Sequence, residues 1–357
     1  MLRFNIYHSV IVLGASAVGV IIVNLIWKKK NCANKDLSNE RNTEKLPSNW
    51  RRVGEVSELM IYPVKSAKAH HLVKARCAAL GLVDSANPLI QLRDREFIVY
   101  DQEKKKAVSG LVNTKITLLE SKVEDDTTIR LSFPEREDFY LKLPKNKLDL
   151  VKLDRWWGEV VSAVDCGDEV ACWLSEAILG PSRSGLRLGH FSQPSVTLRT
   201  VANGWTSFAK VYPRLRDEYL GAYSYMASYL IVSENSVEDL NKRLESPVTP
   251  SHFRANIVVK GNKPYSEDQW DWIKIGDKVI MRGFKPCTRC VIVAIDPKDG
   301  KMDPNFEPLR TLKKYRQIAD PDERELAGQG NEPVFGLYTG LHHTGSVMIG
   351  DPVYVGV

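Results

Sequence analysis

Two cysteines lie three residues apart in the segment FKPCTRCVIVAID, residues 284–296, so thiol chemistry is considered first. Thr288 and Arg289 separate Cys287 from Cys290, and the apolar, β-branched run VIVAID after them predicts a strand. A zinc site needs about four ligands, and a redox dithiol needs its first cysteine at a helix N-terminus. Neither requirement is met in the sequence around the pair. Two further interpretations of the pair stay open beside these. The cysteines are small side chains of the core, or one of them is a thiolate that lies beside a guanidinium and binds a soft or high-valent metal.

Basic and hydroxyl residues recur at the ends of other predicted strands. Lys65 and Ser66 follow the run IYPV, Arg95 precedes EFIVYD, and the segment FRANIV places Arg254 and Asn256 before a third strand. A single lysine or arginine is most often a solvated surface residue. Their repetition at strand ends predicts one anionic cofactor, held by charge-assisted hydrogen bonds between two parts of the chain.

Composition indicates a folded protein of one large or two ordinary domains. The 357 residues carry a formal charge of +6, from 50 basic and 44 acidic residues that are largely interleaved. Without a long single-sign block, the sequence gives no support for nucleic acid as a partner. Six cysteines scattered over so long a chain do not form the dense pattern of a disulfide scaffold, which favours a reducing compartment.

The N-terminus departs from this pattern. Phe4 to Trp27 contains no Asp, Glu, Lys or Arg, and about 20 apolar residues suffice to span a bilayer. Lys28 to Lys30 follow at once, so the positive-inside rule predicts an anchor over residues 1–30 with the rest of the chain in the cytosol. The alternative is a cleaved signal peptide, although its basic residues should then come first. Residues 31–52 are polar and aperiodic, which is typical of a linker.

The first folded part is predicted over residues 53–180. Short strands are expected at EVSELMIYPV, EFIVYD, TIRLSFP and FYLKLP, each bounded by turn-forming residues. A helix is expected after Gly167, capped by Asp168. Its apolar face would consist of Val170, Trp173, Leu174, Ala177 and Ile178. Residues 181–222 lose this periodicity and are expected to form a connection.

The second folded part is predicted over residues 223–357. SYLIVS and NIVVKG predict strands, and SVEDLNKRL predicts a helix capped by Ser236. An Ile-Gly-Asp motif occurs in IKIGDKVIMRG at 273–283 and again in VMIGDPVYVGV at 347–357. Each copy predicts two strands joined by a tight turn, as in a small antiparallel barrel. The predicted fold class is mixed α+β and β-rich, with two β-bodies in tandem.

Six segments in this order, IYPVKS, LRDREF, FRANIVV, PCTRC, LRTLKKYR and IGDPVYV, resemble the MOSC-domain proteins of the mitochondrial amidoxime-reducing component type. The ordered set is more specific than any one segment, and the resemblance covers nearly the whole chain. It implies an N-terminal MOSC β-barrel-like domain and a MOSC β-barrel domain, preceded by one transmembrane helix.

The resemblance also implies a molybdenum cofactor, a pterin dithiolene that bears a phosphate and binds one molybdenum atom. Cys287 matches the catalytic metal ligand, and Cys290 matches the second cysteine, which is not the ligand. The implied cofactor-binding residues are Lys65, Ser66, Arg95, Ser228, Arg254 and Asn256. One departure is that Tyr225 to Ala227 stand where relatives often carry an Asp-Thr-Ser run, with Ser228 one place later.

The activity implied by the resemblance is the reduction of N-hydroxylated compounds, such as amidoximes and hydroxylamines, at the outer mitochondrial membrane. No dinucleotide fingerprint is present, so electrons are expected from other proteins. In this family these are cytochrome b5 and NADH-cytochrome b5 reductase. The alternatives are a cofactor or sulfur carrier without turnover, and a binding protein whose site has decayed. The related cofactor sulfurases carry a further pyridoxal-phosphate domain, for which this chain has no room.

Overall fold

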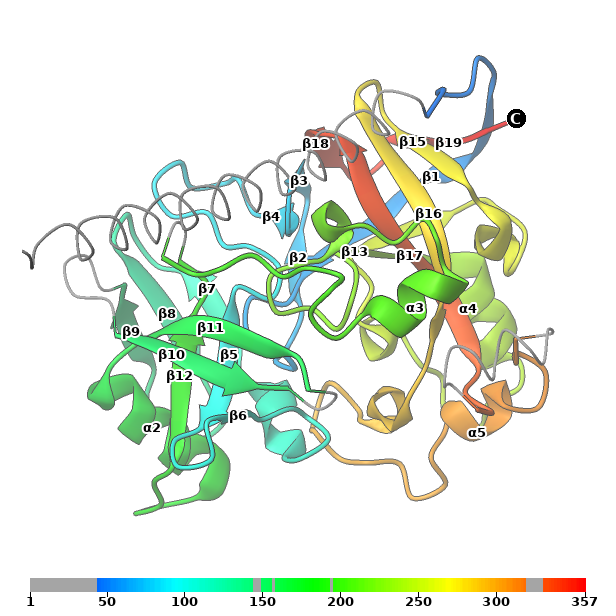
Figure 1. Ribbon diagram of the computed structural model, residues 1–357. Helices are drawn as coiled ribbons and strands as arrows, with labels where there is room; N and C mark the ends of the chain where they lie inside the picture. Colours follow the sequence, from blue (N-terminus) through cyan, green and yellow to red (C-terminus); the bar gives the residue numbers. More distant parts are fainter. Residues whose placement is uncertain (1–43, 144–148, 156–157, 193–194, 319–329) are drawn as a thin grey trace, which may run out of the picture. The chain divides into compact units, whose positions relative to one another are not determined.

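The computed structural model (Figure 1) describes residues 44–143, 149–155, 158–192, 195–318 and 330–357. The chain divides into two units, Met1–Ser48 and Asn49–Val357, and the architecture below is that of the second unit. The predicted anchor over residues 1–30 and the first part of the predicted linker lie outside the described residues. None of the described helices is both long enough and apolar enough to cross a membrane.

The larger sheet has eight strands in the order β14-β13-β17-β16-β15-β19-β1-β2, and it closes on itself because β1 also pairs with β14. In β19, Val353 and Val355 are buried and alternate with partly exposed residues, the period of two expected when one face of a strand is covered. The strands are β1 (Trp50–Ile61), β2 (His70–Leu72), β13 (Tyr229–Ser233), β14 (Ile257–Lys260), β15 (Trp272–Ile275), β16 (Val279–Thr288), β17 (Val334–His343) and β19 (Pro352–Gly356).

Strand β1 brings the beginning of the second unit and the C-terminal strand into one sheet. Leu59 pairs with Ile257 of β14, and Arg51 pairs with Val355 of β19. In Figure 1 the blue β1 ribbon accordingly runs beside the C-terminal strand β19. The predicted linker therefore ends earlier than expected, because β1 begins at Trp50. Val53, the predicted start of the first folded part, lies within β1, and β1 belongs to the same sheet as the C-terminal strands. This predicted boundary therefore does not separate one sheet from another.

A smaller barrel closes from the strands β10 (Leu150–Asp154), β11 (Val160–Asp165), β12 (Leu186–His190), β5 (Phe97–Asp101) and β6 (Lys106–Ala107). Strand β12 lies in the segment 181–222 that was expected to be a connection, so that expectation is wrong for this part. Its five residues pair with β5 along their whole length, and the helix α2 packs against it. The β-rich prediction, with barrels and few helices, is confirmed.

Two three-stranded sheets and four short α-helices complete the described fold. One sheet has the order β18-β3-β4 and the other β7-β8-β9. Their strands are β18 (Gly345–Met348), β3 (Lys74–Ala78), β4 (Gly81–Val83), β7 (Glu120–Val123), β8 (Thr128–Ser132) and β9 (Phe139–Lys142). The α-helices are α2 (Asp168–Leu179), α3 (Thr206–Val211), α4 (Glu234–Asn241) and α5 (Leu309–Leu312).

The helix predictions are confirmed in position but wrong in their caps. Gly167 occupies the N-cap of α2, and the carboxylate of Asp168 accepts a hydrogen bond from Arg187 Nη1 at 2.8 Å instead of capping. In α4 the cap is Ser233, whose side chain accepts from the backbone N–H of Ser236. Each predicted cap lies inside its helix, one residue after the observed cap in α2 and three residues after it in α4.

The two Ile-Gly-Asp motifs have different outcomes. The first forms the predicted hairpin, in which β15 pairs with β16 from Trp272 with Arg282 to Ile275 with Val279. The second also forms two strands, β18 and β19, but they pair with β3 and with β1 and β15 instead of with each other. The strands of the first motif therefore belong to one sheet, whereas the strands of the second motif belong to two different sheets.

Candidate functional site

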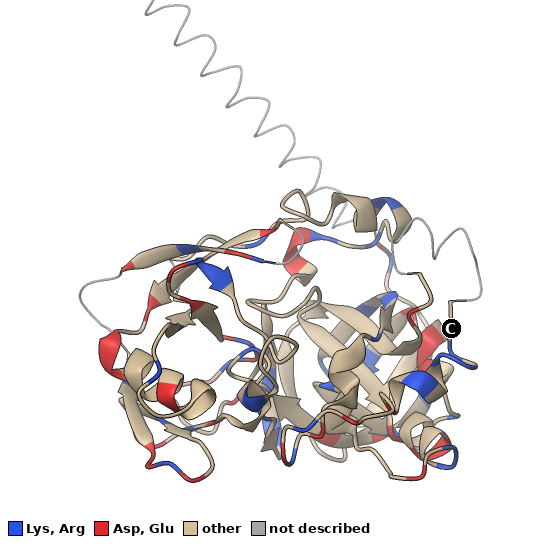
Figure 2. Ribbon diagram, turned by 90° about the horizontal axis from the view of Figure 1, so that it is seen from below, with Lys and Arg blue, Asp and Glu red and all other residues tan. Residues whose placement is uncertain are grey.

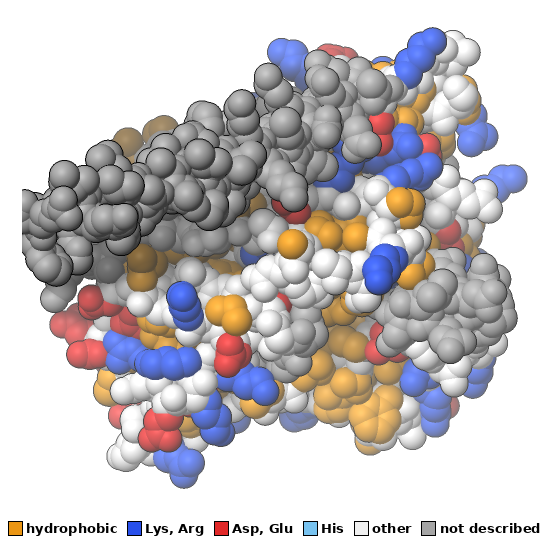
Figure 3. Space-filling model, in the orientation of Figure 1, with side chains coloured by type: hydrophobic (Ala, Val, Ile, Leu, Met, Phe, Trp, Pro, Cys, Tyr) orange, Lys and Arg blue, Asp and Glu red, His pale blue; other side chains and the backbone are white. Residues whose placement is uncertain are grey.

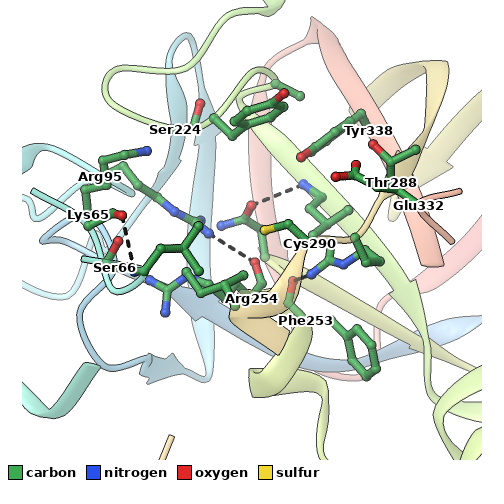
Figure 4. Close-up of a pocket in the computed structure, with 18 residues that line it drawn as sticks. Lys65, Ser66, Arg95, Ser224, Phe253, Arg254, Thr288, Cys290, Glu332 and Tyr338 are labelled. Carbon is green, nitrogen blue, oxygen red and sulfur yellow. Dashed lines mark hydrogen bonds between the residues drawn. The ribbon is translucent and has the colours of Figure 1, made fainter. Parts of the chain in front are cut away.

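A cavity of about 330 Å³ collects residues from segments far apart in the chain (Figure 4). Five of the predicted cofactor-binding residues line it, namely Lys65, Ser66, Arg95, Arg254 and Asn256. Over the surface, by contrast, basic and acidic side chains are interleaved (Figures 2 and 3). The cavity is therefore the place where three distant strand-end segments concentrate positive charge.

Lys65 and Arg95 are brought together by a short pairing beyond the end of β1. The backbone N–H of Lys65 donates to Phe97 O at 2.8 Å, and that of Arg95 donates to Tyr62 O at 2.9 Å. The Lys65 ammonium donates to Tyr223 O at 2.8 Å. Burial, reinforced by the neighbouring arginines, lowers the pKa of Lys65 well below its usual value. An anion placed here would relieve this penalty.

The Arg95 guanidinium has a fixed orientation. Its Nη1 lies 2.6 Å from both carboxylate oxygens of the buried Asp94, and its Nη2 donates to Arg254 O at 3.1 Å. Asp94 is itself held because it accepts from Tyr62 N at 2.9 Å. A carboxylate held in this way positions the arginine before any ligand arrives.

Arg254 is less completely paired. Its guanidinium carbon lies 4.2 Å from the centroid of the Tyr62 ring, over which the Arg95 guanidinium also lies at 4.3 Å. Burial, reinforced by Arg95, lowers the pKa of Arg254 to about 10. The buried Nη2 has no hydrogen-bond partner among the described residues. An unpaired buried donor is costly, and an anionic ligand would satisfy it.

Three cavity residues adopt left-handed backbone conformations. The φ angles are 71° at Ser66, 50° at Arg95 and 56° at Arg254. Residues other than glycine rarely adopt this backbone conformation. Such strain persists where the surrounding structure imposes it, and it clusters at ligand-binding sites. The left-handed backbone at these three residues is therefore a further indication that the cavity is a ligand-binding site.

Asn256 and Ser228 are placed differently from the three basic residues. Asn256 accepts from Leu230 N at 3.1 Å and donates to Met60 O at 3.2 Å, which ties β13 to β1 beside the cavity. Ser228 is buried, does not line the cavity, and its Oγ has no partner among the described residues. Of the predicted cofactor-binding residues, Ser228 is therefore the one placed behind the cavity wall.

The two cysteines differ in what they face. Cys287 is 1% exposed, belongs to the hydrophobic core and accepts a hydrogen bond at Sγ from Arg289 Nη1 at 2.7 Å. Cys290 is exposed and lines the cavity. Although the residue has exposed surface, the protein around its sulfur withdraws water and raises the pKa of the Cys290 thiol, and the backbone N–H of Ile292 and the charge of Arg289 partly offset this. The sulfur that reaches the cavity is that of Cys290, not that of Cys287.

The run after the cysteines is not the predicted strand. β16 ends at Thr288, and Val291–Ala294 form the 3-10 helix η5. The chain turns here, and the turn directs Cys290 to the cavity after Cys287 has entered the core. The described residues contain no group of three or more His, Cys, Asp or Glu side chains arranged for a metal.

Sequence reasoning missed several cavity residues. They include Leu111, Ser224, Tyr225 as a lining side chain, Glu332 and Tyr338, while Arg289 was noted only as the guanidinium beside a thiolate. Arg289 lay between the two cysteines and could have been chosen by its position next to a thiol. The others come from loops or from one face of a strand, where no periodic pattern distinguishes them.

A second charged cluster lies behind the cavity wall. Glu159 is fully buried between two arginines, with contacts of 2.9 Å to Arg155 Nη1 and 2.7 Å to Arg199 Nε. The same arginines donate to Ser224 O, at 2.9 Å from Arg155 Nη2 and 3.1 Å from Arg199 Nη1. This cluster fixes the segment that carries Ser224 and Tyr225 into the cavity.

Known proteins resemble the chain over most of its length. The MOSC domain family matches residues 218–354, and the MOSC N-terminal beta barrel domain family matches residues 53–181. Mitochondrial amidoxime-reducing component 1 of Mus musculus is 36% identical over 305 residues, which cover 85% of this chain and 83% of the relative. The Homo sapiens protein of the same name is 37% identical over 305 residues, with 85% and 84% covered. The Xenopus laevis protein is 32% identical over 349 residues, with 97% and 92% covered.

Proposed function

The chain belongs to the family of mitochondrial amidoxime-reducing components, and on this premise we propose that it reduces N-hydroxylated compounds at a molybdenum cofactor held in the cavity. The observation that carries the proposal is convergence. Strand-end residues from three distant segments meet around one cavity into which a single exposed thiol, that of Cys290, also projects. The N-terminal segment of residues 1–30 would anchor the protein in the outer mitochondrial membrane.

The cavity fits a cofactor that carries a phosphate. Lys65, Arg95 and Arg254 supply charge-assisted donors, and Ser66 supplies a hydroxyl beside them. The unpartnered Nη2 of Arg254 and the lowered pKa of Lys65 are both costs that a bound dianion removes. When bound, the cofactor supplies a metal that accepts oxygen and changes oxidation state by two electrons.

We further propose that Cys290 is the metal ligand. The resemblance assigned this role to Cys287, but the Cys287 sulfur lies in the core and is already engaged by Arg289. Thiolate is the soft ligand that suits such a metal, and only a sulfur at the cavity can bind one held there. Cys287 would instead hold the Arg289 guanidinium in place beside Cys290.

The reaction breaks the N–O bond of the substrate. An amidoxime takes up two electrons and two protons and gives an amidine and water. The protein binds and orients the two reactants, and the electrons come one at a time from cytochrome b5, which NADH-cytochrome b5 reductase reduces. The mixture of apolar and polar residues around the cavity mouth admits a small organic substrate.

The test is the metal content of cysteine variants of the full chain, produced in a host that makes molybdenum cofactor. We expect about one molybdenum and at least one phosphorus per chain in the wild type. Cys290→Ala should lose molybdenum, whereas Cys287→Ala and the exposed control Cys172→Ala should retain it. Loss of molybdenum only in Cys287→Ala would return the ligand assignment to Cys287.

Turnover distinguishes an enzyme from a carrier. Benzamidoxime reduction is measured with NADH, cytochrome b5 reductase and cytochrome b5. We expect turnover by the wild type and none by Cys290→Ala. A wild-type protein that holds molybdenum but gives no benzamidine would contradict the enzymatic proposal and favour a cofactor carrier.

A further inference from the structure

The cavity has two chemically different ends. Figure 4 shows Lys65, Arg95 and Arg254 on one side, Glu332 and Tyr338 on the other, and the Cys290 label between them. An anionic group bound among the cations therefore leaves the opposite end for a second molecule.

Glu332 is the only carboxylate among the lining residues of the cavity in the described part of the chain. It lies just before β17, is half-buried, and forms no hydrogen bond or ion pair with the described residues. Burial raises the pKa of its carboxyl, while Lys285 and Lys313 lower it from a distance. A half-buried acceptor that is left without a donor is suited to take one from a ligand.

Aromatic side chains accompany this carboxylate. The Tyr225 ring is 40% exposed and lines the cavity, and it is held edge-on by Trp205 at a centroid distance of 5.3 Å. Glu332 and Cys290 are among the groups whose charges raise the pKa of Tyr225, after burial, to about 12, so all three side chains share one region. Tyrosine faces attract organic cations, and their apolar area accepts a flat body.

Lys285 acts on the Glu332 carboxylate from a distance, and its ammonium also lies 5.9 Å from the centroid of the Tyr338 ring, but no ion pair joins Lys285 to Glu332 in the described part of the chain. Its ammonium donates to Pro286 O at 3.0 Å and to Thr288 Oγ1 at 3.3 Å, and it lies 5.1 Å from the centroid of the Tyr212 ring. The Glu332 oxygens stay available to a ligand in the cavity.

We propose that Glu332 determines substrate specificity by accepting N–H hydrogen bonds from an amidine-type group, with Tyr225 and Tyr338 against the body of the ligand. The site then prefers substrates in which the carbon bound to the N-hydroxyl nitrogen also carries an amino group. It also binds the cationic amidine product more tightly than a neutral amide of the same shape. This inference rests on the proposed function for the direction of the reaction, but the binding preference itself needs no turnover.

The experiment is calorimetric titration of the full, cofactor-loaded chain at pH 8 with benzamidine, a cation, and with benzamide, its neutral counterpart. We expect the wild type to bind benzamidine more tightly. Glu332→Gln should weaken benzamidine binding about tenfold or more and leave benzamide binding unchanged, because a hydrogen bond to a charged group is lost. Added salt should weaken benzamidine binding in the wild type and have less effect on the variant.

Two further variants control for side effects. Glu332→Asp keeps the charge and should recover part of the benzamidine affinity, and Glu103→Gln removes an exposed carboxylate away from the cavity and should change neither ligand. Equal losses for benzamidine and benzamide, unchanged benzamidine binding in Glu332→Gln, or no benzamidine binding by the wild type would each overturn the proposal. Absence of benzamidoxime turnover would instead contradict the proposed function and leave a measured binding preference intact.

Discussion

Two clusters of buried cations lie on either side of the segment that carries Ser224 and Tyr225, and they are built differently. Behind the cavity, Arg155 and Arg199 share the fully buried carboxylate of Glu159. Facing the cavity, Asp94 pairs with Arg95, whereas Arg254 has a buried Nη2 without a hydrogen-bond partner among the described residues.

The comparison separates structural charge from binding charge. In the cluster behind the wall, the Glu159 carboxylate forms ion pairs with both arginines and the loop carbonyls accept hydrogen bonds from them, so the cluster contributes to holding the loop. In the cavity cluster, Arg254 keeps an unpartnered Nη2 and left-handed backbone persists at Ser66, Arg95 and Arg254. Buried charge that is not balanced within the protein implies an external partner of opposite sign.

The largest effect is expected from Glu159→Gln. The variant leaves Arg155 and Arg199 facing each other in the core without their counter-ion, a change that costs about 3–5 kcal/mol of folding free energy. Trp205, which donates to Glu159 Oε1 at 3.0 Å, also loses its charged acceptor. Urea denaturation of the full chain measures the loss as a lower midpoint at unchanged slope.

The control is Glu103→Gln, which removes an exposed carboxylate and should change the free energy of unfolding by less than about 0.5 kcal/mol. If Glu159→Gln were as stable as this control, the cluster behind the wall would not be structural and the comparison would fail. A partial loss accompanied by loss of cofactor would show that the two clusters are coupled through the loop.

Arg254→Met should have the opposite signature. Methionine keeps an unbranched stem over Tyr62 but removes a buried charge that lacks a partner, so the free energy of unfolding should change by about 1 kcal/mol or less. The affinity for a phosphate-bearing ligand should fall about tenfold or more, because a charge-assisted donor is lost. Phosphorus and molybdenum content per chain, measured with the urea midpoint, tests both halves. A strongly destabilised variant would make Arg254 structural.

The sequence could predict the cationic end because its residues follow recognisable strand-end motifs. Lys65, Arg95 and Arg254 each stand beside an apolar run whose strand character was evident, and these runs meet in the folded chain. The wall cluster was not predicted, since Arg155, Glu159 and Arg199 lie in no motif. Their roles arise only when three separate segments pack together.

The choice between the two cysteines shows a different limit. Residues three apart on a strand point to opposite faces, so the spacing itself indicates that only one of Cys287 and Cys290 can face a cavity. Which of the two cysteines faces the cavity depends on where β16 ends. The turn after β16 could not be predicted, because the apolar run VIVAID favours a strand. Glu332, in a loop without periodicity, gave no signal at all.

The smallest predicted effect is a proton taken up when an anion binds. The pKa of Lys65 is well below 10.5 in the folded protein because of burial and the nearby arginines, so folding releases a proton and this group adds stability as pH rises towards 10.5. A bound dianion favours the charged ammonium and raises this pKa again. Binding of inorganic phosphate to the cofactor-free chain should therefore take up a fraction of a proton and weaken as pH rises.

Calorimetry in buffers of different ionisation enthalpy measures this uptake directly. Lys65→Met should abolish the component that belongs to Lys65, while Lys122→Met, at an exposed position outside the cavity, should leave it unchanged. The second ionisation of phosphate itself contributes equally to all three proteins, so only the difference between them is assigned to Lys65. Identical uptake in Lys65→Met and the wild type would mean that Lys65 does not change its charge when the anion binds, which would contradict the prediction.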